Sequence, residues 1–431
     1  MFREGGGFLL IGTHVDDIFP LCNPEGEKIR TRVLLALKSK VEGEEKGEIK
    51  YALDMHIERD AQKGTLCISQ KNYIDGIINE FQAKEAIGKD TPAPADDIKE
   101  TDAPITEAEK QEALQFPVRN AIGKLWWAAL VSRPDILCAL HKCATWQNTP
   151  SLKLWLHIMW IIKYLKTTRD QTITYRRQEE GGDKLYAFCD ASFGAERNSK
   201  SRTGHFFCVL GALIAWTSVH TTRVVTSSTE AECHAIVQVL KENRWIKEFL
   251  QELNVFKIDK ATIIYQDNKS AISLTQNKGQ HKRSKHFGIE FDAVRESVRE
   301  GEIEVKYLDT QNMPADMLTK SLGKAAFNKH KEVIMGGRGI EGIVSQQEAA
   351  GRVGGDLGSA HDCLGTEDQD QDAKPSTSQA KLKPKDDDAK KPKPKDQAAK
   401  KLKAKEPKDQ EEEPTAKPPT RGRARVREER E

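Results

Sequence analysis

The last aromatic residue of this 431-residue chain is Phe327, and no Phe, Tyr or Trp follows it. A segment without large apolar side chains cannot bury enough surface to offset the conformational entropy lost on folding. Residues 331–431 are instead rich in Lys, Pro, Asp and Glu, and their last fifty have an excess of basic residues. We therefore expect a disordered basic, Lys/Pro-rich tail at 331–431 and a folded part before it.

Two interpretations of the tail stay open. Its basic clusters KLKPK, KPKPK and RGRARVR would attract nucleic acid or act as a nuclear targeting signal. A tail that only keeps the protein in solution would have a similar composition, so composition does not separate the two.

Membrane insertion and secretion are disfavoured. No apolar run approaches the ~18 residues of a membrane span, and no small-residue cleavage site follows the apolar run Phe8–Ile11. The eight cysteines form no C-x-x-C pair, which favours free buried thiols over disulfides or a zinc site. We expect an intracellular protein, cytoplasmic or nuclear or both, that is not secreted and has no membrane partner.

The first 175 residues divide into three parts. Residues 1–90 contain a hairpin-like apolar segment, GGGFLLIGTHVDDIFPLC, a strand pair and the amphipathic helix NYIDGIINEF. Residues 91–104 form a linker rich in Pro and Asp. Residues 105–175 are predicted to be helical and contain five of the seven tryptophans. For these tryptophans a helix-packing core is favoured over a base-stacking surface.

Residues 176–330 alternate strands and helices. The runs LYAFCD, TGHFFCVLGALIAWTS, ATIIYQD and IEVKYLD have the character of strands, and the second predicts a hairpin that turns at Gly211. A long helix is predicted from Thr229 to Leu253, and shorter helices surround the last two strands. This order predicts an α/β fold, a mixed sheet with flanking helices, which we expect to fold as a domain of its own.

Acidic residues stand where two of these strands end. Asp190 follows LYAFC and Asp267 follows TIIYQ, so the two carboxylates would share one sheet edge if the strands were neighbours. Clustered carboxylates raise each other's pKa unless a cation neutralises them, and Mg²⁺ prefers carboxylate oxygen. Two such ions roughly 3.5–4 Å apart would suit in-line attack on a phosphodiester.

Helix phase suggests a third acid. Glu232 shares a face with Ile236 and Leu240, which should pack on the sheet. Glu230 lies about 200° away around the helix and is expected to face solvent. The alternative for Glu232 is structural, because Thr229-x-x-Glu232 matches a capping box. Asp316 opens the last helix, where an acid also stabilises the helix dipole.

Four segments, SSTEAECHAI, IIYQDNKSAISL, HKRSKHFGIEFDAVRE and YLDTQNMPADMLTK, resemble the ribonuclease H domain of copia-type retrotransposon Pol polyproteins in order and spacing. The resemblance covers about residues 184–325. It implies a ribonuclease H fold that cleaves the RNA of RNA–DNA hybrids with two Mg²⁺ per site, or Mn²⁺ in their place. The family's catalytic, metal-binding acids fall on Asp190, Glu232, Asp267 and Asp316. One departure is Ser192, where copia elements usually have a second Asp.

The same resemblance implies roles for the basic loop HKRSKH. Lys282, Arg283, Lys285 and His286 are expected to contact the phosphates of the hybrid without reading sequence. His281 or His286 could also relay protons or aid product release. A merely solvated basic loop is the alternative.

The resemblance extends upstream. The stretch containing SRPDI looks like the connection between polymerase and nuclease, and LCISQKNYIDGIINEF looks like the start of a reverse transcriptase thumb. HVDDIF resembles the family's aromatic-x-Asp-Asp hairpin, which would make Asp16 and Asp17 a polymerase metal pair. His14 replaces the usual Tyr, and Asp54 stands where a Gly is expected. The chain begins at this hairpin, so we expect an incomplete palm and thumb, with an exposed acidic turn in place of a working polymerase site.

We thus expect a retrotransposon-derived ribonuclease H attached to a truncated, inactive reverse transcriptase. Its expected partners are an RNA–DNA hybrid and, through the tail, other nucleic acid. One alternative is a catalytically silent nucleic-acid-binding remnant. Another is a fragment of a full polyprotein with RNA-directed DNA polymerase activity. The oligomeric state is not encoded in any of these patterns.

Overall fold

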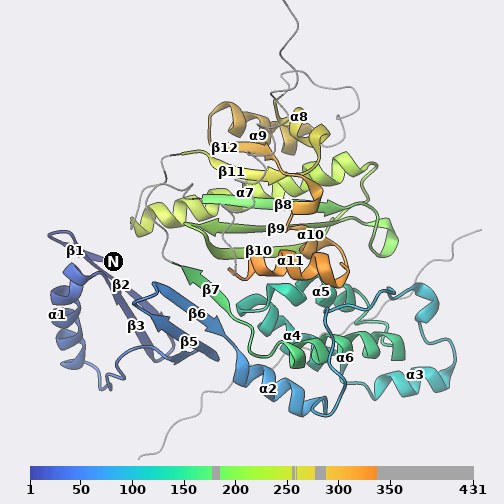
Figure 1. The fold of residues 1–431 in the computed structure, drawn as a ribbon, viewed down its shortest axis with the longest axis horizontal. Helices are drawn as coiled ribbons and strands as arrows, with labels where there is room; N and C mark the ends of the chain where they lie inside the picture. Colours follow the sequence, from blue (N-terminus) through green and yellow to red (C-terminus); the bar gives the residue numbers. More distant parts are fainter. Residues whose placement is uncertain (177–184, 255–257, 259, 277–287, 337–431) are drawn as a thin grey trace, which may run out of the picture. The chain divides into compact units, whose positions relative to one another are not determined.

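A computed structural model of the chain describes residues 1–176, 185–254, 258, 260–276 and 288–336 (Figure 1). All of them belong to one compact unit. Most of the expected tail therefore lies outside the described residues. Its first residues belong to the end of a helix, α11 (Lys324–Ile334), whose Val333 and Ile334 are buried.

Residues 1–80, together with one strand from residues 173–176, form two small antiparallel sheets. The first sheet has the order β1-β2-β3, and the second has the order β4-β5-β6-β7. The strands and helices of these groups are β1 (Phe2–Glu4), β2 (Gly7–His14), β3 (Asp17–Cys22), α1 (Glu27–Lys38), β4 (Tyr51–Ala52), β5 (Met55–Asp60), β6 (Thr65–Ser69), α2 (Lys71–Glu80) and β7 (Ile173–Arg176). The hairpin, the strand pair and the amphipathic helix are confirmed, and α1 is an addition that the sequence patterns did not predict.

The helical part is built from α3 (Glu107–Leu114), α4 (Val118–Val131), α5 (Leu137–Thr145) and α6 (Leu152–Thr167). Trp146 is buried, and Trp126 and Trp155 pack against the same apolar cluster, as the helix-packing interpretation predicts. Arg133 and Asp135 are fully buried and paired at 2.7 Å between Nη2 and Oδ2. The hydroxyl of Tyr164 donates to the same Oδ2 at 2.6 Å, so the SRPDI segment is locked by a satisfied ion pair.

The main sheet has five strands in the order β10-β9-β8-β11-β12. Its strands are β8 (Leu185–Ser192), β9 (Arg202–Val209), β10 (Ala212–His220), β11 (Thr262–Gln266) and β12 (Ile303–Tyr307). Its helices are α7 (Ser228–Leu253), α8 (Lys269–Gln276), α9 (Gly288–Arg299) and α10 (Asp316–Thr319). The three strands β8, β9 and β10 are antiparallel, and β11 is parallel to both β8 and β12. The predicted mixed sheet with flanking helices is confirmed.

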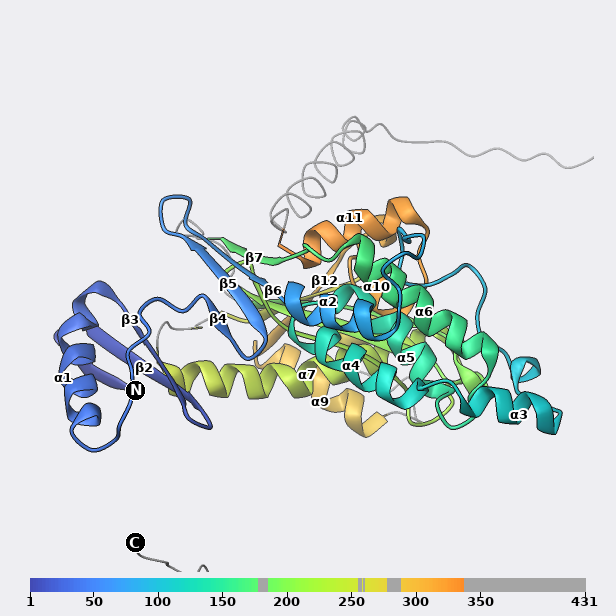
Figure 2. The same ribbon diagram turned by 90° about the horizontal axis from the view of Figure 1, so that it is seen from below.

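Each face of this sheet has its own apolar cluster, because successive side chains of a strand point to opposite faces. Leu185, Ala187 and Cys189 of β8 pack with the apolar side of α7. Tyr186 and Phe188 pack instead with α4, α5 and α6, three helices that lie together in Figure 2. The apolar cluster that contains Tyr186 and Phe188 therefore includes residues from both sides of the 175/176 boundary. We expected one domain to end and another to begin at that boundary.

The expected linker, residues 91–104, is attached along its length to the parts around it. Asp97 pairs with Lys142 at 2.8 Å, and Glu100 pairs with Arg197 at 2.6 Å. The indole of Trp160 donates to the carbonyl of Thr91 at 2.9 Å. These contacts hold the segment against both the helical part and the loop after β8.

The described cysteines are all free thiols, and five of the seven are buried, as the sequence predicts. Of the described helices, none combines the length and apolar character that crossing a membrane requires.

Candidate metal centre

The first two acids are brought together by the pairing of β8 with β11. The parallel register aligns Ile263 with Tyr186 and Tyr265 with Phe188, and the pairing ends there. Asp267 and Asp190 are each two positions further along, so they stand side by side where the strands separate. The condition set by the sequence, that the two strands be neighbours, is met.

The third acid comes from the first turn of α7, and the cap of this helix differs from the predicted one. Ser227 is the N-cap, and its hydroxyl accepts from the backbone nitrogen of Glu230 at 3.1 Å. The Glu230 carboxylate in turn accepts from the backbone nitrogen of Thr226 at 2.7 Å. The capping-box alternative for Glu232 is therefore wrong, because the helix is capped two residues earlier, by Ser227 and Glu230. The prediction that Glu230 faces solvent is also wrong, because this capping role keeps it buried.

Glu232 is thus free to face the sheet edge. One oxygen from each of Asp190, Glu232 and Asp267 lies within 4.8 Å of the other two. Asp190 and Glu232 are buried and Asp267 is half-buried. The side chain of Gln266 donates to Glu232 Oε2 at 3.2 Å, and the hydroxyl of Thr310 donates to Asp267 Oδ2 at 2.8 Å. Three close carboxylates with oriented oxygens could bind a divalent metal ion.

The electrostatics of the cluster favour a bound cation. Burial raises the pKa of Asp190 to about 6, with Lys320 opposing the rise and Asp316 adding to it. Burial, followed by the charges of Asp190 and Asp267, raises the pKa of Glu232 to about 9. The pKa of Asp267 is raised by burial and by Asp190. Without a counter-ion, ionising all three carboxylates is therefore costly.

Asp316 does not join this group of three, but it is linked to Asp190 through Lys320. Lys320 Nζ is 2.8 Å from Asp316 Oδ1 and 3.2 Å from Asp190 Oδ2, so its ammonium joins the two carboxylates. The hydroxyl of Thr319 also donates to Asp190 Oδ2. Asp190 is therefore shared between the three-carboxylate group and the Asp316–Lys320 pair.

Lys320, Thr319 and Gln266 were not recognised from the sequence. A signal existed for Lys320, because it lies four residues after Asp316, the spacing at which oppositely charged side chains of a helix pair. No local pattern marks the other two, whose partners are distant in the chain.

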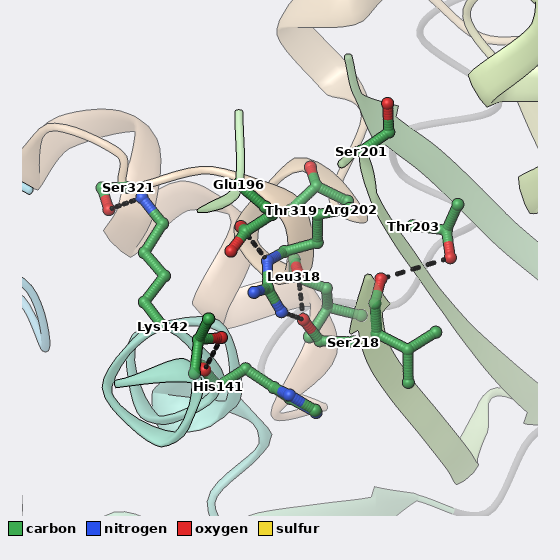
Figure 3. Close-up of polar contacts among 12 residues, drawn as sticks. His141, Lys142, Glu196, Ser201, Arg202, Thr203, Ser218, Leu318, Thr319 and Ser321 are labelled. Carbon is green, nitrogen blue, oxygen red and sulfur yellow. Dashed lines mark hydrogen bonds and ion pairs between the residues drawn. The ribbon is translucent and has the colours of Figure 1, made fainter. Parts of the chain in front are cut away.

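The turn α10 is positioned by contacts with β9 and β10 (Figure 3). A Cβ atom on Gly204 of β9 would lie 2.6 Å from Cβ of Leu318, so only glycine allows this approach. The hydroxyl of Ser218 donates to the carbonyl of Leu318 at 2.6 Å. The fully buried Arg202 donates to the Ser218 hydroxyl at 3.1 Å and pairs with Glu196 at 2.6 Å. The same turn thus presents Asp316, Thr319 and Lys320 to Asp190.

The hairpin acids are in a different environment. Asp16 and Asp17 are exposed at the turn between β2 and β3, and His14 is paired with Asp17 in the ladder. Of the residues the structure describes, only Asp190, Glu232 and Asp267 form a group of three or more ligands close enough for a metal. Asp54 has a φ of 60°, a backbone conformation that favours the glycine expected there.

The predicted phosphate-contacting residues Lys282, Arg283, Lys285 and His286, and with them His281, lie outside the described residues.

The main sheet is mixed and flanked by helices, and three largely buried carboxylates meet at the ends of its strands. These features define an α/β protein with a candidate divalent-metal centre. The chain is 30% identical over 330 residues to the retrovirus-related Pol polyprotein from transposon TNT 1-94 of Nicotiana tabacum, covering 76% of this chain and 24% of that one. It is 26% identical over 337 residues to the retrovirus-related Pol polyprotein from transposon RE2 of Arabidopsis thaliana, covering 78% and 22% respectively. The chain is similar to copia-type retrotransposon Pol polyproteins, and it spans about a quarter of the length of these relatives.

No protein-family model matches the chain. Of the solved structures, LC11-RNase H1 isolated from compost aligns with a TM-score of 0.26 and 15% identity, over 34% of this chain and 98% of that one. The same protein in complex with an RNA/DNA hybrid aligns with a TM-score of 0.24, over 32% and 94%.

Proposed function

We propose that the protein is a retrotransposon-derived ribonuclease H that cleaves the RNA strand of RNA–DNA hybrids by metal-dependent hydrolysis. The observation that carries this proposal is the convergence of Asp190, Glu232 and Asp267, from two strand ends and one helix, to within 4.8 Å. Similarity to the Pol polyproteins supports it, since the acids lie in motifs that resemble the nuclease of that family. The expected intracellular location, cytoplasmic or nuclear, stays a prediction.

In this proposal the residues of the chain hold the metal and orient its ligands. Asp190, Glu232 and Asp267 would bind Mg²⁺, while Gln266 and Thr310 fix the carboxylate orientations. Bound Mg²⁺ would lower the pKa of an attacking water and stabilise the leaving 3′ oxygen. The hybrid would be recognised through its shape, phosphates and 2′-hydroxyls.

Polymerase activity is not part of the proposal. Asp16 and Asp17 are exposed and belong to no ligand group among the described residues. We propose that residues 1–90, which resemble part of a reverse transcriptase palm and thumb, do not by themselves form a polymerase metal site.

The test is cleavage of a short RNA–DNA hybrid, labelled on the RNA, by the full chain with Mg²⁺. We expect cleavage by the unmodified protein and none above background by Asp190→Asn or Asp267→Asn. Glu304→Gln, which changes an exposed acid of β12, is the matched control and should retain activity. Cleavage that survives either Asp→Asn change would refute the site. Tight hybrid binding without cleavage by the unmodified protein would favour the silent binding remnant.

A further inference from the structure

Asp190 faces two different cation positions. Its carboxylate contributes one oxygen to the group with Glu232 and Asp267, in which the three oxygens lie within 4.8 Å of one another. The same carboxylate is also joined to Asp316 by the ammonium of Lys320, which pairs with both. A carboxylate shared in this way is the arrangement that bridges two cations.

The contacts of Lys320 are those of a bound cation. Its Nζ is 3.3 Å from Oδ1 and 3.2 Å from Oδ2 of Asp190, and 2.8 Å from Oδ1 of Asp316. The two carboxylates that it joins are almost fully buried, with 1% and 10% of their side-chain surface exposed. Water therefore screens these charges little, and the ammonium is the main source of their neutralisation.

The backbone holds the lysine in this position. The backbone nitrogen of Lys320 donates to the backbone carbonyl of Asp316 at 2.9 Å, and this hydrogen bond closes the turn α10. The preceding residue, Thr319, donates its hydroxyl to Asp190. Gly204 and Ser218 hold this turn against the sheet. The turn therefore positions Lys320 beside Asp190 and Asp316.

We infer that Lys320 takes the place of one of the two metal ions that the resemblance to the family's nuclease implies. In the protein without substrate, one divalent ion binds at Asp190, Glu232 and Asp267, and the ammonium occupies the position between Asp190 and Asp316. A Mg²⁺ ion between Asp190 and Asp316 would lie about 2.0–2.1 Å from their oxygens. That space is occupied by the Lys320 ammonium, whose like charge would also repel the ion. This inference rests on the proposed nuclease function and makes Lys320 a positioning residue of that site.

The test is a count of Mn²⁺ ions bound per full-length chain, measured by isothermal titration with manganese chloride and no nucleic acid. Each protein is also measured with the additional change Asp190→Asn. The ions that still bind to that form are subtracted, so that weak binding elsewhere on the chain is not counted. We expect one such ion in the unmodified protein and two in Lys320→Met. Lys320→Arg, which keeps the positive charge, should bind one. Lys324→Met, at an exposed lysine paired with Asp90, is the matched control and should bind one.

The outcomes separate the two proposals. Two ions in the unmodified protein, or one ion in both it and Lys320→Met, would overturn the role of Lys320 and leave the nuclease proposal standing. No ion in any variant would remove the metal centre and the nuclease proposal with it. Circular dichroism of each variant shows whether it is folded, and a variant that binds two ions is necessarily folded at the site.

Discussion

Two places in this molecule carry acids at strand ends, and both resemble metal sites of the same family. At the β2–β3 hairpin, Asp16 and Asp17 are adjacent in sequence, exposed and supported by one small sheet. At the edge of the main sheet, Asp190, Glu232 and Asp267 come from three elements and meet in a mostly buried position. A motif supplies ligand types, but a metal centre also requires that distant elements enclose them.

The two environments differ because of what covers each sheet. Both faces of the main sheet are packed, one against α7 and the other against the helical part, so acids at its edge lose water. At the hairpin turn the carboxylates remain hydrated. Repulsion between buried carboxylates is what makes the site at the edge of the main sheet require a cation.

The largest expected effect tests this contrast directly. Glu232→Gln keeps the side-chain shape and removes a charge that the metal needs. We expect hybrid cleavage to fall roughly a thousandfold or more, the equivalent of several kcal/mol of lost metal stabilisation. The metal-free protein should at the same time melt at a higher temperature, because the pKa of Glu232 is raised to about 9 in the folded state and glutamine has no such cost of burying an ionisable carboxyl. The double change Asp16→Asn, Asp17→Asn should alter neither quantity, and a large loss of cleavage there would break the contrast.

The second prediction concerns the turn that reaches Asp190. Gly204→Ala places a Cβ against Leu318 and Thr319 and should displace α10. We expect destabilisation by about 1–3 kcal/mol and a loss of cleavage of up to about a hundredfold, as for a displacement near 1 Å. Gly123→Ala, in α4 with open space at the new Cβ, is the control and should leave cleavage unchanged. Full activity in Gly204→Ala would show that α10 is not held as described.

The third prediction is a dependence of stability on pH. The pKa of Asp190 is raised to about 6 and that of Glu232 to about 9, whereas unfolded carboxyls titrate near about 4. The folded state keeps these protons longer, so the metal-free stability should fall as the pH rises from about 4 through both values.

Magnesium should reverse this decline, because it binds the ionised carboxylates. At an ion concentration about a hundredfold above its Kd, the gain should be about 2.7 kcal/mol, measured by thermal melting with and without Mg²⁺. The gain should be larger at alkaline than at acidic pH. Asp190→Asn should lose it, and a gain independent of pH would contradict the buried-carboxylate account.

The smallest expected effect concerns the start of α7. Ser227→Ala removes the observed cap and should cost about 1 kcal/mol of unfolding free energy. Thr229→Ala removes the cap that the sequence suggested and should cost much less. Urea denaturation of the two variants distinguishes the two caps, and equal losses would argue against the Ser227 assignment.

The sequence alone determined the order in which the strands and helices of the main sheet follow one another along the chain, and it marked Asp190 and Asp267 directly after two strands. The strands β8 and β11 could be predicted because their apolar runs are continuous. Asp190 and Asp267 could be picked out because each directly follows such a run. Those signals are local, since strand and helix periodicity extend over a few residues. The resemblance to a known nuclease added the choice of Asp316.

Only the tertiary structure decided which side chains surround those acids. Lys320 and Asp190 are 130 positions apart, and their meeting depends on how closely α10 approaches Gly204. Glu232 and Asp316 come from opposite faces of the sheet, and they reach Asp190 because the pairing of β8 with β11 ends before it. Contacts of this range depend on strand order and packing, which no pattern within a single segment contains.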